Sequence, residues 1–125
     1  MAEKKVRTVL GDIRPEEMGY TSLHDHAFLD MRPTAAFMES IMPPIPPEQL
    51  EFRPENYSFL KDGMFLLCKD LQVVDDLDGL TKEYRYFAAL GGQTVVETTP
   101  SALRGAPIGQ LAELSRRTGL HFICA

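Results

Sequence analysis

Two histidines at strand spacing are the residues of this chain that best fit a chemical role. His24 and His26 flank Asp25 in the segment Tyr20–His26, whose residues favour a β-strand. Side chains two positions apart share one face of a strand, so both imidazoles point the same way and Asp25 points opposite. Together they can bind one divalent ion such as zinc, each through a ring nitrogen at about 2.0–2.1 Å. The alternative is a pair that fills space at the strand end or bonds backbone carbonyls.

The other polar residues do not complete a catalytic site. A catalytic zinc takes three protein ligands and a water, so two histidines are too few. Glu97 stands alone in an apolar strand candidate, where it could orient a ligand histidine. The alternative is that it ends outside the core or pairs with a basic residue. Asp25 is expected to bond backbone or a helix end, and His121, which begins its own strand, is expected to be structural. Ser101 and Ser115 have no partnered His and Asp, so no nucleophile triad and no catalytic residue is predicted in this chain.

The strand that carries the histidines needs neighbours to position it. Three strands are predicted, at Tyr20–His26, Thr94–Thr99 and His121–Ala125. One predicted helix begins at Asp75 and precedes the second strand, and another begins at Pro107 and precedes the third. Strands that alternate with crossover helices pair in parallel, which indicates an α/β fold. The carboxyl ends of parallel strands carry the sites of such folds, and the two histidines stand at that end.

Apolar residues at helical spacing indicate how the helices cover the sheet. Residues expected to pack together on the two helices are Leu77, Leu80, Tyr84, Phe87, Ile108, Leu111 and Ala112. Their expected partners on the strands are Val95, Val96, Phe122 and Ile123, because parallel strands covered by helices are almost continuously apolar. Ahead of the histidine strand, Val6–Ile13 is predicted to be one short strand followed by a turn between Pro15 and Gly19.

Residues 27–74 are predicted to be a long irregular insertion. Met42–Pro47 holds four prolines, which exclude a helix interior and a central strand. Its overlapping PxxP matches could dock an SH3-type groove, but a stiff loop is the expected state. Tyr57–Cys68 fits a helix that packs across this loop.

Composition and charge limit the class of protein. The chain has 125 residues, enough for one domain, with 44% hydrophobic residues, 25% charged residues and a net charge of −5. The negative charge argues against a nucleic-acid-binding protein, which needs a basic surface. No stretch approaches the ~18 apolar residues of a membrane span, and none fits a signal peptide. Cys68 and Cys124 form no zinc-knuckle or disulfide pattern, so a cytoplasmic location is expected.

Five blocks of the sequence, spread from one end to the other, form an ordered pattern: Val6–Ile13, Glu16–Thr21, His24–His26, Gly91–Pro100 and Ala112–Ile123. In this order they resemble the phosphotriesterase family, specifically the phosphotriesterase-like lactonases of the amidohydrolase superfamily. The resemblance implies the N-terminal part, about three strands, of a (β/α)8 TIM barrel of the metal-dependent hydrolase type. It also implies two divalent metals, usually zinc, one of which His24 and His26 would bind. A hydroxide that bridges the metals would then attack a lactone, ester or phosphotriester.

The same resemblance predicts which parts of the site lie elsewhere. The family completes its site with a carboxylated lysine on strand four, histidines on strands five and six, and an aspartate on strand eight. Residues 1–125 reach the third strand, whereas a whole barrel takes about 250 residues. We therefore expect an incomplete phosphotriesterase-like barrel domain that is inactive alone and that, when complete, acts on a small molecule and can form a homodimer. The alternatives are a short non-catalytic binding or assembly module, or another amidohydrolase branch such as a deaminase or dihydroorotase-like enzyme.

Overall fold

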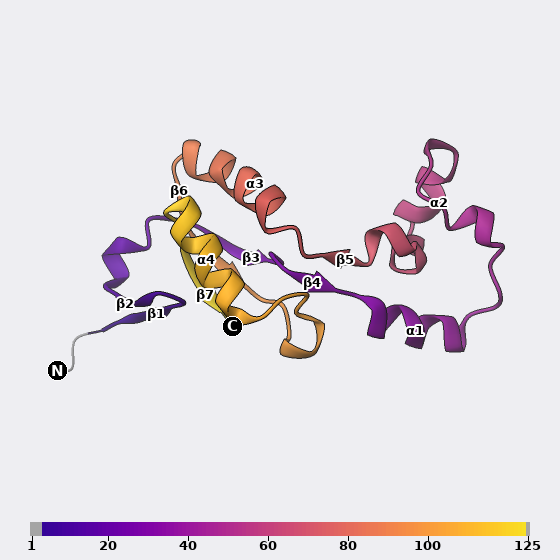
Figure 1. The fold of residues 1–125 in the computed structure, drawn as a ribbon, viewed down its shortest axis with the longest axis horizontal. Coiled ribbons are helices and arrows are strands. Elements are labelled where there is room, and N and C mark those ends of the chain that lie inside the picture. Colours follow the sequence, from indigo (N-terminus) through magenta and orange to yellow (C-terminus); the bar gives the residue numbers. More distant parts are fainter. Residues whose placement is uncertain (1–3, 125) are drawn as a thin grey trace.

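A sheet of three parallel strands lies at the centre of the structure, a computed structural model that describes residues 4–124. The strands are β3 (Tyr20–Asp25), β6 (Gly92–Glu97) and β7 (His121–Cys124), in the order β3-β6-β7 (Figure 1). Both strand pairs are parallel, which confirms the predicted α/β order. The carboxyl ends of all three strands consequently meet at one edge of the sheet.

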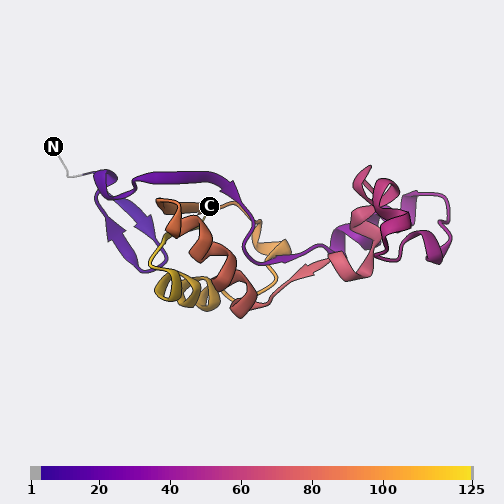
Figure 2. The ribbon, with the colours of Figure 1, turned by 90° about the horizontal axis from the view of Figure 1, so that it is seen from above.

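Two helices cover one face of this sheet (Figure 2). They are α3 (Leu77–Ala89) and α4 (Ile108–Thr118), close to the predicted starts. The Asp76 carboxylate caps α3 by accepting the backbone N–H of Asp78 at 3.0 Å. Gly119 ends α4 at a φ of +73°, a left-handed conformation that glycine adopts without a steric penalty.

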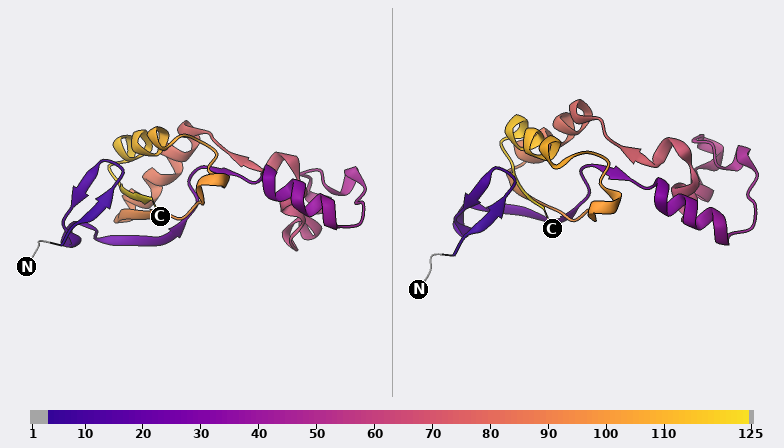
Figure 3. Two further views of the ribbon diagram at one scale, coloured as in Figure 1. Left: turned by 90° about the horizontal axis from the view of Figure 1, so that it is seen from below. Right: turned by 60° about the horizontal axis from the view of Figure 1, so that its bottom comes forward.

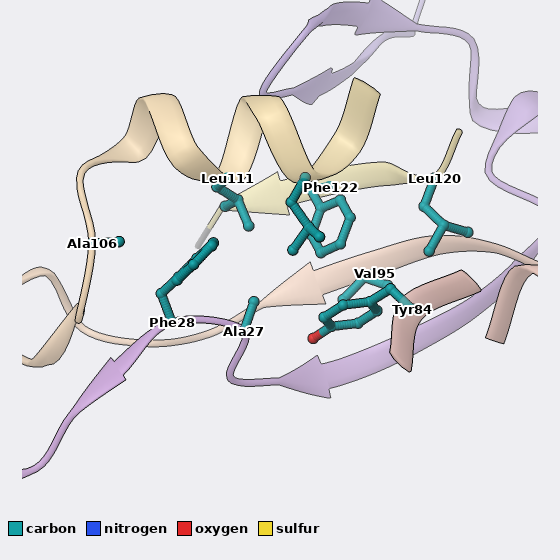
Figure 4. Close-up of a cluster of buried hydrophobic side chains, with 9 residues drawn as sticks. Ala27, Phe28, Tyr84, Val95, Ala106, Leu111, Leu120 and Phe122 are labelled. Carbon is teal, nitrogen blue, oxygen red and sulfur yellow. The ribbon is translucent and has the colours of Figure 1, made fainter. Parts of the chain in front are cut away.

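Side chains from both helices and from the strands form one buried cluster (Figure 4). Its members are Ala27, Phe28, Tyr84, Val95, Ala106, Leu111, Leu114, Leu120 and Phe122. Leu77, Leu80, Phe87 and Ala88 pack against it while partly exposed. We call residues 20–28 and 77–124 the sheet region.

The predicted inner face of α4 is wrong at one end. Ile108 is 50% exposed, because it sits in the first turn of the helix, ahead of the part that packs on the strands. Leu114, which the prediction omitted, is fully buried. Leu114 and Ser115 lie three and four residues after Leu111, and together the three form the buried face of the helix.

The N-terminal segment folds back on itself instead of forming one strand. β1 (Val6–Thr8) and β2 (Gly11–Ile13) are antiparallel partners, joined by a tight turn. Gly11 at a φ of +129° permits this reversal. The backbone N–H of Val9 in the turn donates to the Phe122 carbonyl at 2.9 Å, which attaches the hairpin to β7.

The expected irregular insertion, residues 27–74, contains more regular structure than predicted. β4 (Leu29–Asp30) pairs antiparallel with β5 (Val73–Val74), and this two-stranded ribbon leads to α1 (Arg32–Ile41) and α2 (Tyr57–Lys61). The chain between them is built of short 3-10 turns at Pro47–Gln49, Pro54–Asn56, Met64–Leu67 and Lys69–Leu71. We call residues 32–71 the distal module, and Figure 3 shows it projecting away from the sheet region.

Individual prolines and glycines explain why the distal module differs from the prediction. Pro33 stands in the first turn of α1, where a missing N–H costs nothing, and the proline-rich run from Pro43 ends the helix. The helix predicted at Tyr57–Cys68 is split, because Gly63 adopts a φ of +107° between α2 and the next 3-10 turn. Within residues 4–124, no helix is both long and apolar enough to cross a membrane.

Candidate metal centre

The rings of His24 and His26 converge at the carboxyl end of β3. Their Nε2 atoms lie 3.2 Å apart, and the ring planes are inclined by 83°. Two nitrogens bound tetrahedrally to one zinc at about 2.0–2.1 Å lie about 3.3 Å from each other. The donor pair therefore fits two adjacent positions around one ion of this size.

An irregularity in β3 precedes the histidines. Ser22 pairs with Val95 and Asp25 with Glu97, so β3 holds one residue more than β6 over this stretch. Bulges of this kind bend a strand and re-aim its side chains, often beside a site. Both imidazoles are exposed in this chain, whereas the next residues along it, Ala27 and Phe28, are buried in the core cluster.

Asp25 ties the end of the histidine strand to its surroundings through hydrogen bonds. Its carboxylate accepts the backbone N–H of His26 at 2.8 Å, as predicted for a residue that bonds backbone. Its carbonyl accepts the backbone N–H of Thr98 at 2.9 Å. Burial, followed by the negative charge of Asp25 and a hydrogen bond with it, raises the pKa of the Tyr84 phenol on α3 well above its usual range. Tyr84 therefore stays protonated and joins α3 to the strand that bears the histidines.

Glu97 is buried and close to His26, but it does not touch that ring directly. It is 1% exposed at the end of β6, and Arg104 Nη2 lies 3.8 Å from its Oε2. Its Oε1 bonds the Thr99 hydroxyl, and Thr99 Oγ1 lies 2.9 Å from His26 Nδ1. Glu97 thus pairs with a basic residue, as one alternative predicted, but it does so inside the core, and it contacts His26 through Thr99.

Thr99 is the residue of this site that the sequence did not single out. It lies two residues beyond the end of β6 and is fully buried. A threonine at a strand end is ordinary, so its residue type gave no signal. The useful signal was positional: β6 is parallel to β3, so its carboxyl end lies at the same edge as His26.

The remaining candidates lie outside this cluster. His121 pairs with Thr94 at the start of β7, whereas Cys124 and Glu97 pair at the other end, so His121 lies away from the two-histidine edge. The Ser115 hydroxyl donates to the Leu120 carbonyl at 2.6 Å, a structural bond at the end of α4. Within residues 4–124 no group of three or more His, Cys, Asp or Glu is arranged to hold a metal.

Curated proteins match this chain along almost its whole length. N-acetyltaurine hydrolase from Rattus norvegicus is 31% identical over 123 residues, which are 95% of this chain and 33% of that protein. The N-acetyltaurine hydrolase of Danio rerio is also 31% identical, over 124 residues with the same coverage. The chain therefore spans about a third of the length of the curated relatives it matches.

Solved structures share the fold. A resiniferatoxin-binding protein from Rhodobacter sphaeroides is similar with a TM-score of 0.75 and 28% identity, over 96% of this chain and 33% of that one. The organophosphorus hydrolase from Deinococcus radiodurans gives a TM-score of 0.57 and 26% identity, over 96% of this chain and 27% of that one. A lactonase from Listeria monocytogenes, at 22% identity and a TM-score of 0.61, covers 97% of this chain and 27% of that one and supports the fold alone.

These matches confirm both the predicted fold class and the predicted family. The parallel βαβαβ order and the partial coverage of each neighbour agree with the N-terminal part of a TIM barrel. The model of the phosphotriesterase family matches residues 4–125, nearly every residue of the sequence. The chain belongs to the phosphotriesterase family.

Proposed function

We propose that this chain forms the N-terminal part of a metal-dependent hydrolase and supplies two ligands to its metal centre. The observation that carries the proposal is the 3.2 Å approach of the His24 and His26 Nε2 atoms at the carboxyl end of β3. In barrel enzymes the active site forms at that end of the strands. Zinc is the ion we propose, with a second divalent metal in the complete barrel.

Each nearby residue has a separate task in this proposal. His24 and His26 hold the ion, and the bonds of Asp25 to the backbone of His26 and Thr98 keep the strand end in place. A bound divalent metal would polarise the bond to be cleaved and lower the pKa of a water, which then attacks at neutral pH. The further ligands and the groups that contact substrate would come from strands beyond β7.

The substrate is proposed to be a small molecule with an ester, lactone or phosphotriester bond. The N-acetyltaurine hydrolase relatives add a second candidate bond, the amide of a small N-acyl compound. All four bonds are cleaved by attack of an activated water on an electrophilic carbon or phosphorus. We further propose a cytoplasmic enzyme that can assemble as a homodimer when the barrel is complete.

The experiment compares residues 1–125 with the barrel extended through eight strands. Both proteins are purified, their metal content is measured, and both are assayed on lactone, ester, phosphotriester and N-acyl amide panels. We expect about two metals per extended chain, turnover that a chelator removes and zinc restores, and no turnover by residues 1–125. Two imidazoles leave a zinc half-coordinated, and the sheet of the short form has unpaired edges.

Two outcomes would contradict the proposal. An extended barrel that binds no metal and cleaves no substrate would favour the non-catalytic binding or assembly module. Chelator-sensitive turnover by purified residues 1–125 would mean that the short chain builds a site in another way, for instance by sharing His24 and His26 between two copies.

A further inference from the structure

Thr99 occupies the space between a buried carboxylate and the ring of His26. Its hydroxyl bonds Glu97 Oε1 on one side and lies 2.9 Å from His26 Nδ1 on the other. We propose that Glu97 and Thr99 act as positioning residues that fix the tautomer and the orientation of the His26 ring, so that its Nε2 lone pair faces the metal. This inference rests on the proposed function for its purpose, but not for its hydrogen-bond geometry.

The direction of the hydrogen bonds follows from the atoms involved. Glu97 Oε1 already accepts the backbone N–H of Thr99 at 3.1 Å, so this oxygen is an acceptor. The Thr99 hydroxyl must therefore donate its single proton to Oε1, and it can only accept from the histidine. Nδ1 of His26 consequently carries the ring proton. Its Nε2 is left as the nitrogen that carries a lone pair, and this atom lies 3.2 Å from His24 Nε2.

Burial makes the arrangement rigid. Glu97 is 1% exposed and Thr99 is fully buried, so water has little access to replace either partner. Arg104 holds both residues from the far side, with Nη2 at 3.1 Å from the Thr99 carbonyl and 3.8 Å from Glu97 Oε2. The Glu97 carboxylate and the Thr99 hydroxyl are therefore shielded from water, and the ring of His26 contacts this buried pair.

The two histidines differ in this respect. Within residues 4–124, the hydrogen bonds of the His24 ring go to His26 alone, whereas His26 is bonded at both ring nitrogens. Outer partners that orient a metal-binding histidine typically contribute about 10–100-fold to metal affinity. We therefore assign His26 as the preorganised ligand and His24 as the ligand that adjusts to the ion.

The test uses the protein that carries the complete barrel. Thr99→Val keeps the shape of the side chain but removes the hydroxyl, and Thr99→Ser restores it. Thr94→Val is the matched control, because Thr94 is also fully buried on β6, and its hydroxyl bonds the Met18 carbonyl at 2.6 Å without contacting either histidine. Glu97→Gln is a second route to the same question if Thr99→Val does not fold.

The first readout needs no metal. Long-range ¹H–¹⁵N NMR of histidine-labelled, metal-free protein reports which ring nitrogen is protonated, at a pH about two units above the usual imidazole pKa of about 6.5. We expect the proton of His26 on Nδ1 in the wild type, in Thr99→Ser and in Thr94→Val, and a mixture of tautomers in Thr99→Val. A His26 ring protonated on Nε2 in the wild type would overturn the inference.

The second readout is affinity for Zn²⁺, measured by chelator competition, together with the Co²⁺ absorption spectrum. Thr99→Val should weaken Zn²⁺ binding about 10–100-fold and alter the Co²⁺ spectrum, while Thr99→Ser and Thr94→Val stay close to wild type. Equal affinity in Thr99→Val and Thr94→Val would show that the hydroxyl orients nothing. A wild type that binds no metal would instead defeat the proposed function, and the tautomer measurement would still decide the hydrogen-bond relay.

Discussion

The sheet region and the distal module contain similar proportions of apolar residues but bury them to different extents. The sheet region buries one continuous cluster in which Val95, Leu114 and Phe122 are fully buried. In the distal module, the apolar residues that are buried are Ala35, Leu60, Leu67 and Cys68. Large apolar side chains that remain exposed there are Phe37, Ile41, Phe52, Tyr57, Phe59 and Phe65.

The histidines stand where these two regions meet. Immediately after His26 the chain inserts Ala27 and Phe28 into the core of the sheet region, and only then leaves along β4 toward the distal module. The two imidazoles are thus attached to the well-packed region on both sides. Precise positioning of the two histidines therefore depends on the sheet region, and the distal module contributes surface rather than support to this pair.

The largest effect we expect is loss of metal and activity when the pair is removed. His24→Ala combined with His26→Ala should lower turnover of the complete barrel by more than about 100-fold, since direct ligands contribute more than the groups that orient them. Metal content, turnover and circular dichroism would be measured together. The fold should persist, because both imidazoles are exposed. Unchanged metal content would remove the assignment of these ligands.

The second prediction compares how much a buried leucine contributes to stability in each of the two regions. Leu114→Ala should destabilise the protein by about 2–5 kcal/mol, the range for a fully buried leucine. Leu60→Ala, at 3% exposure in the five-residue helix α2, should cost less, because short turns around it can close over the cavity. Urea unfolding gives the two free energies.

Hydrogen exchange locates the part of the protein that each of these two substitutions destabilises. Leu114→Ala should speed exchange in β6 and β7, whereas Leu60→Ala should speed it within the distal module. Equal acceleration of β6 by both variants would mean that the regions unfold as one unit, and the distinction between them would fail.

The sheet region was largely predictable because its signals are local. An apolar stripe marks α3, Asp76 caps it, and Gly119 marks the end of α4, so element type and order followed from residues near in sequence. The distal module and the ribbon that leads to it lack several of these signals. No side chain caps α1, and Ala35 is its one buried residue, whereas β4 and β5 pair over two residues each, which is too short for a strand pattern.

The candidate site likewise has one part that the sequence predicts and another part that it does not. The shared face of His24 and His26 depends on strand periodicity and was predictable, as was the backbone bond of Asp25. The contact between His26 and Thr99 joins residues far apart in the chain and depends on the register of β3 against β6. Two register shifts, one between Tyr20 and Thr21 and one between Ser22 and Asp25, set that register, and no local preference in the sequence specifies them.

A smaller effect concerns the hydrogen bond between Tyr84 on α3 and Asp25 on β3, which the pH dependence of stability can test. The pKa of Tyr84 is raised in the folded protein above its usual value of 10, so the unfolded chain loses the phenolic proton first. The stabilisation is complete below about pH 10 and is lost as the pH rises from there, by about 1.4 kcal/mol per unit. Tyr84→Phe should be less stable than wild type at pH 8 by about 1 kcal/mol, the net value of a hydrogen bond.

This prediction depends on how the difference in unfolding free energy between wild type and Tyr84→Phe changes with pH. Urea unfolding at pH 8 and pH 11 should show the advantage of wild type over Tyr84→Phe shrinking or reversing at the higher pH. Other titrating groups affect both proteins equally and cancel in the difference. A difference that stays constant with pH would mean that Tyr84 is not held protonated by burial and by Asp25.

The smallest effect concerns the exposed apolar surface of the distal module. Phe37 on α1 is 63% exposed, so Phe37→Ser removes little buried area and should change the free energy of unfolding by less than about 0.5 kcal/mol. Phe28→Ala, at 2% exposure in the sheet region, is the contrasting variant and should cost about 3–5 kcal/mol. Both are measured by urea unfolding of the complete barrel. If Phe37→Ser cost as much as Phe28→Ala, the Phe37 ring would be buried against another part of the complete protein, and the distal module would belong to its packed core.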